Sequence, residues 1–105
     1  MYLFEIKREV DTNEKDELNR SIYAWHTVHT CWGYLDLLTG SDEQQHQNSL
    51  LATSSHVFLT KDTSFLIKSN DRIYNPRTDI TYEITFVDNV MELDDHYEIY
   101  CKRWV

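Results

Sequence analysis

Residues that break or cross-link a chain are scarce here: the 105 residues include two glycines, one proline and two cysteines. Two glycines, Gly33 and Gly40, cannot form the glycine-rich loop that cradles a nucleotide phosphate. No apolar run approaches the roughly 20 residues of a membrane-spanning helix, and residues 1–10 lack the pattern of a secretory signal. We therefore expect a soluble protein that is intracellular when it is made and has no membrane partner.

The two cysteines, Cys31 and Cys101, lie in opposite halves of the chain. They are too few to form the disulfide framework that staples small secreted domains. In a reducing compartment we expect both to be free, partly buried thiols. A disulfide between them is the less favoured alternative.

Basic residues are also scarce, with ten Lys and Arg against 18 Asp and Glu, and the formal net charge is −8. This balance argues against sequence-specific binding of nucleic acid, which depends on clustered Lys and Arg. The acidic residues concentrate in two places, one being the early group Glu14, Asp16 and Glu17. The other group comprises Asp88, Glu92, Asp94, Asp95 and Glu98. Solvated turns and strand faces are the simpler interpretation, and a surface that repels or mimics DNA is the alternative.

Aromatic residues, by contrast, are plentiful, with three Trp, seven Tyr and four Phe. Hydrophobic residues make up 41% of the chain, which is enough for a core that needs neither a disulfide nor a metal. The length lies near the commonest domain size. We predict one domain spanning residues 1–105.

Strand-forming segments recur at short spacing along the chain. They are residues 2–10, 22–38, 55–60, 64–68, 72–74, 80–87 and 97–102. Residues 11–20 are polar, and we predict a loop with at most one helical turn there. Gly33, inside the second strand, indicates a bulge or a close backbone contact. The pattern predicts a mainly β fold, a small antiparallel barrel or sandwich of about six strands.

A long polar segment separates the second and third predicted strands. Ser41 and Gln44 have the spacing of a helix capping box. Residues 42–49 nevertheless contain no apolar side chain that could pack a helix onto a core. We predict a long polar loop or a short helix here.

Candidates for metal binding and catalysis are few. His26, His29 and Cys31 are the best zinc ligands by residue type, but strand alternation predicts His26 on the opposite face from the other two. A nucleophile pair of Cys31 with a histidine lacks an identifiable third group to orient it. We expect no metal, no cofactor and no enzymatic activity. The three tryptophans are expected in the core or in subunit contacts, because the chain lacks the basic groove of a base-stacking platform.

Several short motifs follow one another in a particular order along the chain. They are Trp25-His26-Thr27-Val28, a Trp-Gly-Tyr-Leu-x-x-x-x-Gly strand and turn at residues 32–40, a polar arm, Ser55-His56-Val57, Asp71-Arg72-Ile73, Tyr82-Glu83-Ile84 and a terminal hydrophobic strand. This order, over residues 22–102, resembles the head–tail joining proteins of tailed phages, the head-closure or stopper family. Thr60-Lys61-Asp62 departs from that family, whose corresponding strand often ends in arginines.

The resemblance implies a small β-barrel whose copies form a ring below the portal, close the DNA channel and dock the tail. It implies a location in the virion neck, and in the host cytoplasm before assembly. The implied partners are portal, adaptor and tail-completion proteins and further copies of the chain, while DNA passes without being read. The residues implied in lining the channel or in oligomer contacts are Ser41, Asp42, Glu43, Gln44, Gln45, His46, Gln47 and Asn48. The alternative function is an acidic DNA mimic, or another protein-interaction module that inhibits a DNA-binding partner.

Overall fold

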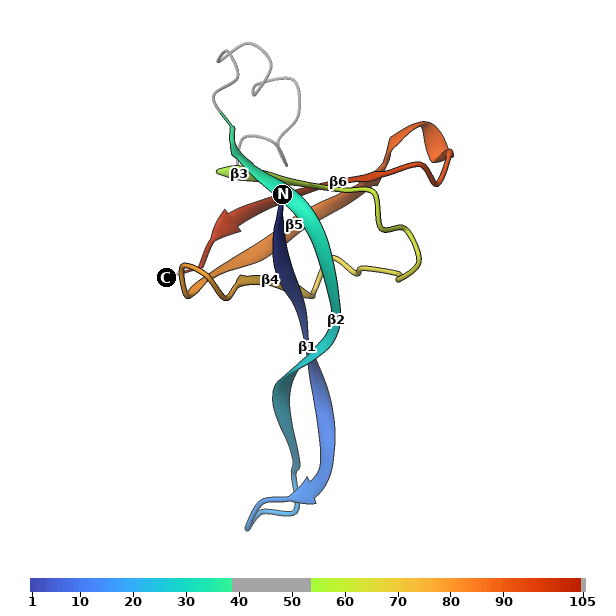
Figure 1. Ribbon diagram of the computed structural model, residues 1–105. Helices are drawn as coiled ribbons and strands as arrows, with labels where there is room; N and C mark the ends of the chain where they lie inside the picture. Colours follow the sequence, from blue (N-terminus) through green and yellow to red (C-terminus); the bar gives the residue numbers. More distant parts are fainter. Residues whose placement is uncertain (39–53, 105) are drawn as a thin grey trace.

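Six strands make up the fold in a computed structural model, which describes residues 1–38 and 54–104. They are β1 (Tyr2–Lys15), β2 (Ser21–Leu37), β3 (His56–Thr60), β4 (Arg72–Asn75), β5 (Ile80–Asn89) and β6 (Tyr97–Arg103), with a short 3-10 turn η1 (Val90–Glu92) before β6. Neighbouring strands are antiparallel, and the order β1-β2-β3-β6-β5-β4 closes into a barrel (Figure 1). The predicted small antiparallel β-barrel is confirmed.

Strands β1 and β2 continue beyond the barrel as a long projecting hairpin (Figure 1). β1 pairs with β4 only at residues 5–7, and β2 pairs with β3 only at residues 34–37. The two strands nevertheless pair with each other as far as Lys15 and Ser21. Among the described residues, the outer hairpin therefore has two unpaired edges. The described chain is elongated, measuring 51 × 29 × 27 Å.

This hairpin corrects the prediction of a loop over residues 11–20. β1 continues to Lys15, and the turn is confined to residues 16–20. There the Asp16 carboxylate accepts hydrogen bonds from the backbone amides of Leu18 and Arg20. The sequence pattern missed the strand because the outer hairpin covers no core, so no hydrophobic alternation marks it.

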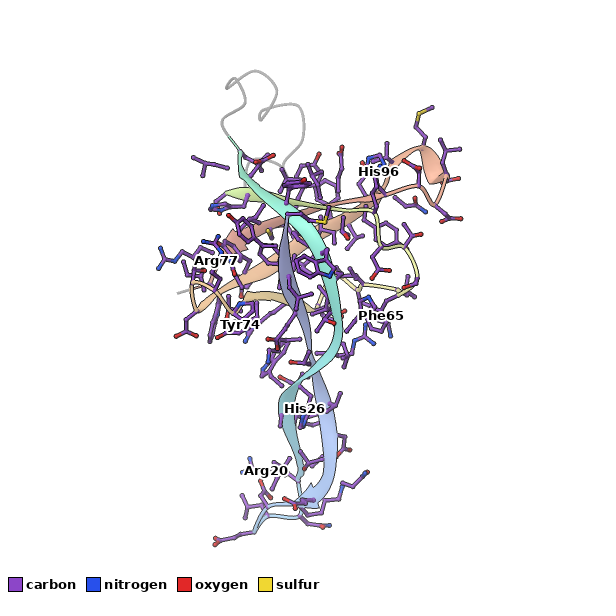
Figure 2. All side chains as sticks on the ribbon, viewed as in Figure 1. Arg20, His26, Phe65, Tyr74, Arg77 and His96 are labelled. Atoms are coloured by element: carbon purple, nitrogen blue, oxygen red, sulfur yellow. The ribbon has the colours of Figure 1, made fainter. Side chains whose placement is uncertain are left out.

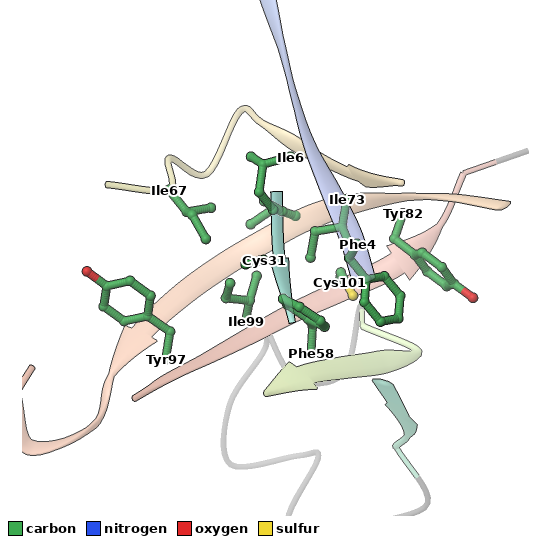
Figure 3. Packing of buried hydrophobic residues seen from close by; sticks show 11 residues of the cluster. Phe4, Ile6, Cys31, Phe58, Ile67, Ile73, Tyr82, Tyr97, Ile99 and Cys101 are labelled. Carbon is green, nitrogen blue, oxygen red and sulfur yellow. The ribbon is translucent and has the colours of Figure 1, made fainter. Parts of the chain in front are cut away.

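One apolar cluster fills the barrel (Figure 3). Its members are Phe4, Ile6, Cys31, Phe58, Ile67, Ile73, Tyr82, Ile84, Tyr97, Ile99 and Cys101. They alternate with more exposed residues along the strands, as the two-residue period of a strand requires. Both cysteines are free and buried, as predicted.

Gly33 makes the predicted close backbone contact. A Cβ atom at this position would lie 2.5 Å from the Leu59 carbonyl oxygen and 2.6 Å from the Phe58 ring. Both distances are shorter than van der Waals contact, so no larger residue fits without a shift of β3. The absence of a side chain at Gly33 thus lets β2 and β3 pack closely around Phe58.

Residues 64–68 form no strand, which corrects another prediction. Ile67 enters the core, and the Phe65 ring stacks on the His29 ring with centroids 4.6 Å apart. Arg8 holds the same segment through two 2.8 Å hydrogen bonds to the Asp71 carboxylate. Phe65 and Ile67 are therefore packed without sheet pairing, whereas Leu66 is exposed.

Candidate interaction surfaces

The predicted arm, residues 41–48, lies outside the described residues. On either side of it, Leu37 pairs with His56, and the Leu38 amide donates a 2.9 Å hydrogen bond to the Ser55 carbonyl. The chain thus leaves β2 and enters β3 at one rim of the barrel. A role of the arm in the channel or in oligomer contacts stays a prediction.

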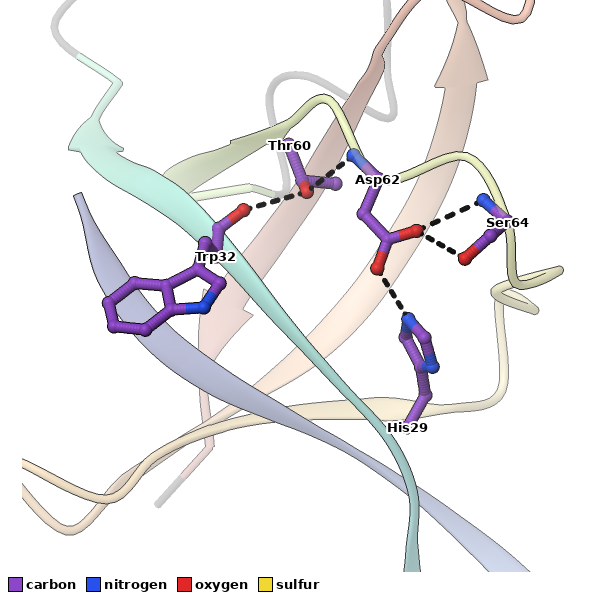
Figure 4. Close-up of polar contacts among 5 residues, drawn as sticks. All are labelled: His29, Trp32, Thr60, Asp62 and Ser64. Carbon is purple, nitrogen blue, oxygen red and sulfur yellow. Dashed lines mark hydrogen bonds and ion pairs between the residues drawn. The ribbon is translucent and has the colours of Figure 1, made fainter.

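A polar network fastens the segment after β3 onto β2 (Figure 4). The Asp62 Oδ2 atom lies 2.7 Å from His29 Nε2, and Oδ1 accepts hydrogen bonds from the Ser64 hydroxyl and amide. These bonds, chiefly that from the Ser64 hydroxyl, hold the pKa of Asp62 below its usual value. The Thr60 hydroxyl donates to the Trp32 carbonyl at 2.9 Å and accepts from the Asp62 amide.

This network presents no activated nucleophile within the described chain. The Ser64 hydroxyl donates to the Asp62 carboxylate, whose lowered pKa makes it a weak base, and not to His29. Burial raises the pKa of the Cys31 thiol to about 11 and that of Cys101 to about 12. Both thiols therefore stay protonated and unreactive near neutral pH.

The fold does not gather the three residues considered as zinc ligands into one site. His26 is exposed on the outer hairpin (Figure 2), His29 bonds Asp62, and Cys31 is buried in the core. A register shift in β2 between Thr27 and His29 also interrupts the alternation on which their predicted faces depended. Within residues 1–38 and 54–104, no group of three His, Cys, Asp or Glu could hold a metal ion.

A groove of about 580 Å³ opens beside the polar network. Trp32 and Tyr34 line it from β2, with 58% and 53% of their surfaces exposed. Carboxylates of Asp62, Asp95 and Glu98 lie around it. An exposed apolar surface with a polar rim is typical of a protein–protein contact.

The turn between β5 and β6 extends this surface. Met91 and Leu93 are 81% and 68% exposed, and Glu92, Asp94 and Asp95 are exposed beside them. Met91, Glu92 and Asp94 adopt φ values of 53°, 58° and 54°, a region that side-chain-bearing residues seldom occupy. Two hydrogen bonds between Asn89 and Asp94, of 2.7 and 3.1 Å, brace the turn.

The opposite end of β5 and β6 carries basic and aromatic side chains. The Arg77 guanidinium lies 4.0 Å from the centroid of the Tyr2 ring. The Arg72 guanidinium lies between two indoles, 4.0 Å from the Trp25 ring centroid and 4.2 Å from that of Trp104. This stack ties the base of the hairpin to β4 and to the end of β6.

The sequence did not identify the groove, although a signal for it was present. Trp32 and Tyr34 alternate with Cys31 and Gly33 along β2. Because Cys31 and Gly33 face the core, the two aromatic side chains face outward. The partners that complete the groove, such as Asp62 and residues 95–98, come from distant strands, and no local pattern links them to β2.

In the described part of the chain, no helix is long and apolar enough to cross a bilayer. No protein-family model matches the chain, and no curated protein matches it. Among solved structures, the fold is similar to the solution structure of protein SF1141 from Shigella flexneri 2a, with a TM-score of 0.67. The alignment covers 98% of this chain and 91% of that chain at 17% sequence identity. A likeness at this identity shows a common fold alone.

Proposed function

We propose that the chain is a structural virion protein of a tailed phage or prophage that acts in head completion and head–tail joining. In this role, copies form a ring below the portal, close the DNA channel through residues 41–48 and dock the tail. One observation carries the proposal: a closed six-stranded barrel bears a long hairpin and, at one rim, the connection between β2 and β3. The barrel and the place of this connection are what the resemblance to head-closure proteins implies, whereas the long hairpin is not part of that resemblance.

The charge of the chain and its described surface support this role. A protein that lines a DNA passage must not hold the phosphates, and a net charge of −8 repels them. Trp32, Tyr34 and Met91 are large, exposed and apolar, which suits them to contacts with neighbouring subunits. The side chains considered for catalysis are instead engaged in packing or in structural hydrogen bonds.

An acidic DNA mimic is the second candidate, favoured by the carboxylates at the β5–β6 turn. A mimic needs carboxylates spaced like phosphates along one face. The two acidic groups instead lie at that turn and at the tip of the hairpin, which project in different directions (Figure 1). This separation makes the mimic the weaker proposal.

The test of head–tail joining is deletion of the gene from the phage or prophage that carries it, followed by electron microscopy of the particles. We expect heads that package DNA but lack tails, and recovery of tailed particles when the wild-type gene is supplied in trans. The barrel should also occupy density in the neck of complete particles. Normal tailed particles after deletion would falsify the proposal.

A matched pair of variants tests the arm separately from the barrel. Replacement of residues 41–48 by a Gly-Ser segment of equal length should leave the melting temperature unchanged but let packaged DNA escape from heads. As the control, a Gly-Ser replacement of the exposed residues Ser69 and Asn70 should retain DNA. DNA retention with the replaced arm would reject its role in closing the channel.

A further inference from the structure

We infer that copies of this chain associate head to tail. The groove of one copy contacts the next copy at the end of β5 and β6 that carries basic side chains, called the basic end below. The groove end comprises Trp32, Asp62, Asp95 and Glu98 with the adjoining β5–β6 turn. The basic end comprises Arg77, Lys102 and Arg103 with the exposed rings of Tyr2 and Trp104. The inference rests on the proposed function for its biological setting, because a ring needs such an interface.

The groove end has more acidic than basic groups, even when the ion pairs within it are taken into account. Its basic groups are Lys61, His96 and the Met1 amino group. His96 lies 3.0 Å from the Asp95 carboxylate and 3.9 Å from that of Glu98, so its charge, when present, is already shared. The exposed carboxylate of Glu92 adds to the surplus. A cationic partner surface is therefore favoured at this end.

The basic end offers the complementary groups. In the part of the chain that the structure describes, the guanidinium groups of Arg77 and Arg103 form no ion pair. Lys102 lies 3.7 Å from the Glu83 carboxylate, and the Asp79 carboxylate accepts a 2.7 Å hydrogen bond from a tyrosine hydroxyl. The two arginines are thus the cations available to a partner.

The chemistry of the groove suits an arginine better than a lysine. A guanidinium binds a carboxylate through its edge and an aromatic ring through its face. The groove supplies both, with the rings of Trp32 and Tyr34 beside the carboxylates of Asp62, Asp95 and Glu98. Arg72 and Arg77 already make stacked contacts of this kind within the molecule.

Arg103 cannot reach the carboxylates of Asp95 and of the β5–β6 turn in the same copy, whereas Tyr34 lines both the groove and a second pocket with Tyr2 and Arg77. The two strands pair from Tyr82 and Arg103 at one end to Asn89 and Tyr97 at the other. At about 3.3 Å per residue these ends lie roughly 23 Å apart, well beyond the screening length of about 10 Å at 0.1 M salt. Figure 2 shows His96 on one side of the barrel and Arg77 on the other. We therefore expect the groove end of one copy to bind the basic end of a second copy. Such a contact is heterologous, the kind that generates rings.

The test is a charge swap measured by sedimentation velocity on the full chain at about 50 mM salt, where ion pairs are weakly screened. The groove-end variant carries Glu92→Lys and Asp95→Lys, and the basic-end variant carries Arg77→Glu and Arg103→Glu. We expect association of the wild type to rise with concentration, and each variant alone to bind itself at least about tenfold more weakly. An equimolar mixture of the two variants should recover the association.

The same experiment includes controls for the net charge of the variants and for their folding. Each double reversal changes the formal charge by four units from −8, so both variants remain negative and have no overall attraction for each other. A third variant with Glu14→Lys and Glu17→Lys at the hairpin tip makes the same charge change as the groove-end variant and should associate like the wild type. Circular dichroism and melting of each variant confirm that the barrel is folded.

A wild type that stays monomeric at millimolar concentration, an equal loss in the tip variant, or a mixture without recovery would each overturn the inference. The outcome is separable from that of the proposed function. Recovery in the mixture together with absence from the neck rejects the function and keeps the interface. Presence in the neck without any effect of the swap rejects the interface and keeps the function.

Discussion

Gly33 is where the packing of β2 against β3 tolerates the least change. We predict that Gly33→Ala lowers the free energy of unfolding by about 1–3 kcal/mol, because the added methyl group must displace the Leu59 carbonyl or the Phe58 ring. Urea denaturation followed by tryptophan fluorescence measures this change. Thr30→Ala, at an exposed position of the same strand, is the control and should change stability by less than about 0.5 kcal/mol. Equal midpoints for the two variants would contradict the predicted clash.

The two thiols provide a second prediction at the scale of residues. Burial raises the pKa of Cys31 to about 11 and of Cys101 to about 12, and only the thiolate reacts with a disulfide reagent. At pH 8 we expect both cysteines to react slowly in the folded protein and rapidly in denaturant. The absorbance of the released thiolate from an aromatic disulfide reagent follows both reactions. Rapid labelling of either cysteine in the folded state would contradict this prediction.

The same thiols make the fold sensitive to alkali. Their folded-state pKa values lie above the ordinary thiol value of 9.0, so above that pH the folded state binds more protons than the unfolded state. Their stabilising contribution is therefore complete below about pH 9 and is lost as the pH rises through 11 to 12. Cys101→Ala removes one of these groups and should flatten the fall in unfolding free energy over this range.

Among the elements, the segment between β3 and β4 depends most on one ion pair. The Asp71 side chain is fully buried, and Arg8 neutralises it with two hydrogen bonds of 2.8 Å. We predict that Arg8→Met costs about 3–5 kcal/mol, because it leaves a buried carboxylate without its partner. Amide exchange should quicken at residues 62–71 first, since Arg8 also bonds the Leu66 carbonyl.

The neighbouring residue provides the control for that variant. Lys7 makes a more exposed ion pair with Glu5 at 3.2 Å, so Lys7→Met should cost less than about 1 kcal/mol. Chemical denaturation of the two variants in parallel separates the roles of the two cations. Equal losses would show that the burial of Asp71 does not decide the energy.

How far an element could be predicted from sequence depended on whether it faces the core. β6 was predicted closely because Tyr97, Ile99 and Cys101 all point inward and mark its two-residue period. Residues 11–15 of the outer hairpin were predicted as a loop because their side chains cover no core. Residues 64–68 have strand-forming side chains, yet they form no strand, and Ile67 packs in the core from an irregular segment. The residue types of a segment indicate whether its side chains are buried, but not whether its backbone pairs with a neighbouring strand.

The candidate surfaces were harder to predict than the strands for the same reason. Closure of the barrel brings Trp32 close to Asp62 and residues 95–98. The sequence pattern of a single strand cannot predict this proximity. The stack of Trp25, Arg72 and Trp104 likewise joins three separate elements. Strand number follows from local periodicity, whereas the surfaces follow from strand order, which depends on pairing between distant segments.

At the scale of the molecule, the fold divides into a barrel that contains the core and a hairpin that contributes nothing buried to it. No residue between 11 and 23 is buried, whereas the core cluster extends around all six strands and the segment before β4. The barrel's stability should therefore be independent of the outer hairpin. A projection that the fold does not need for stability is available for contacts with neighbouring proteins.

A shortened chain tests this division. Val10 pairs with Ala24, so an Asn-Gly turn can replace residues 11–23 in register and close a two-residue hairpin. We expect the free energy of unfolding to change by less than about 1 kcal/mol, because no buried surface is removed and loop closure is slightly favoured. Trp25→Ala is the comparison: it leaves the hairpin long but removes one ring from the Arg72 stack, and it should cost about 1–2 kcal/mol. In the deletion strain, the shortened barrel should fold and still fail to restore tailed particles. Restoration would show that the hairpin is dispensable for joining, and unfolding of the shortened chain would show that the barrel is not an independent unit.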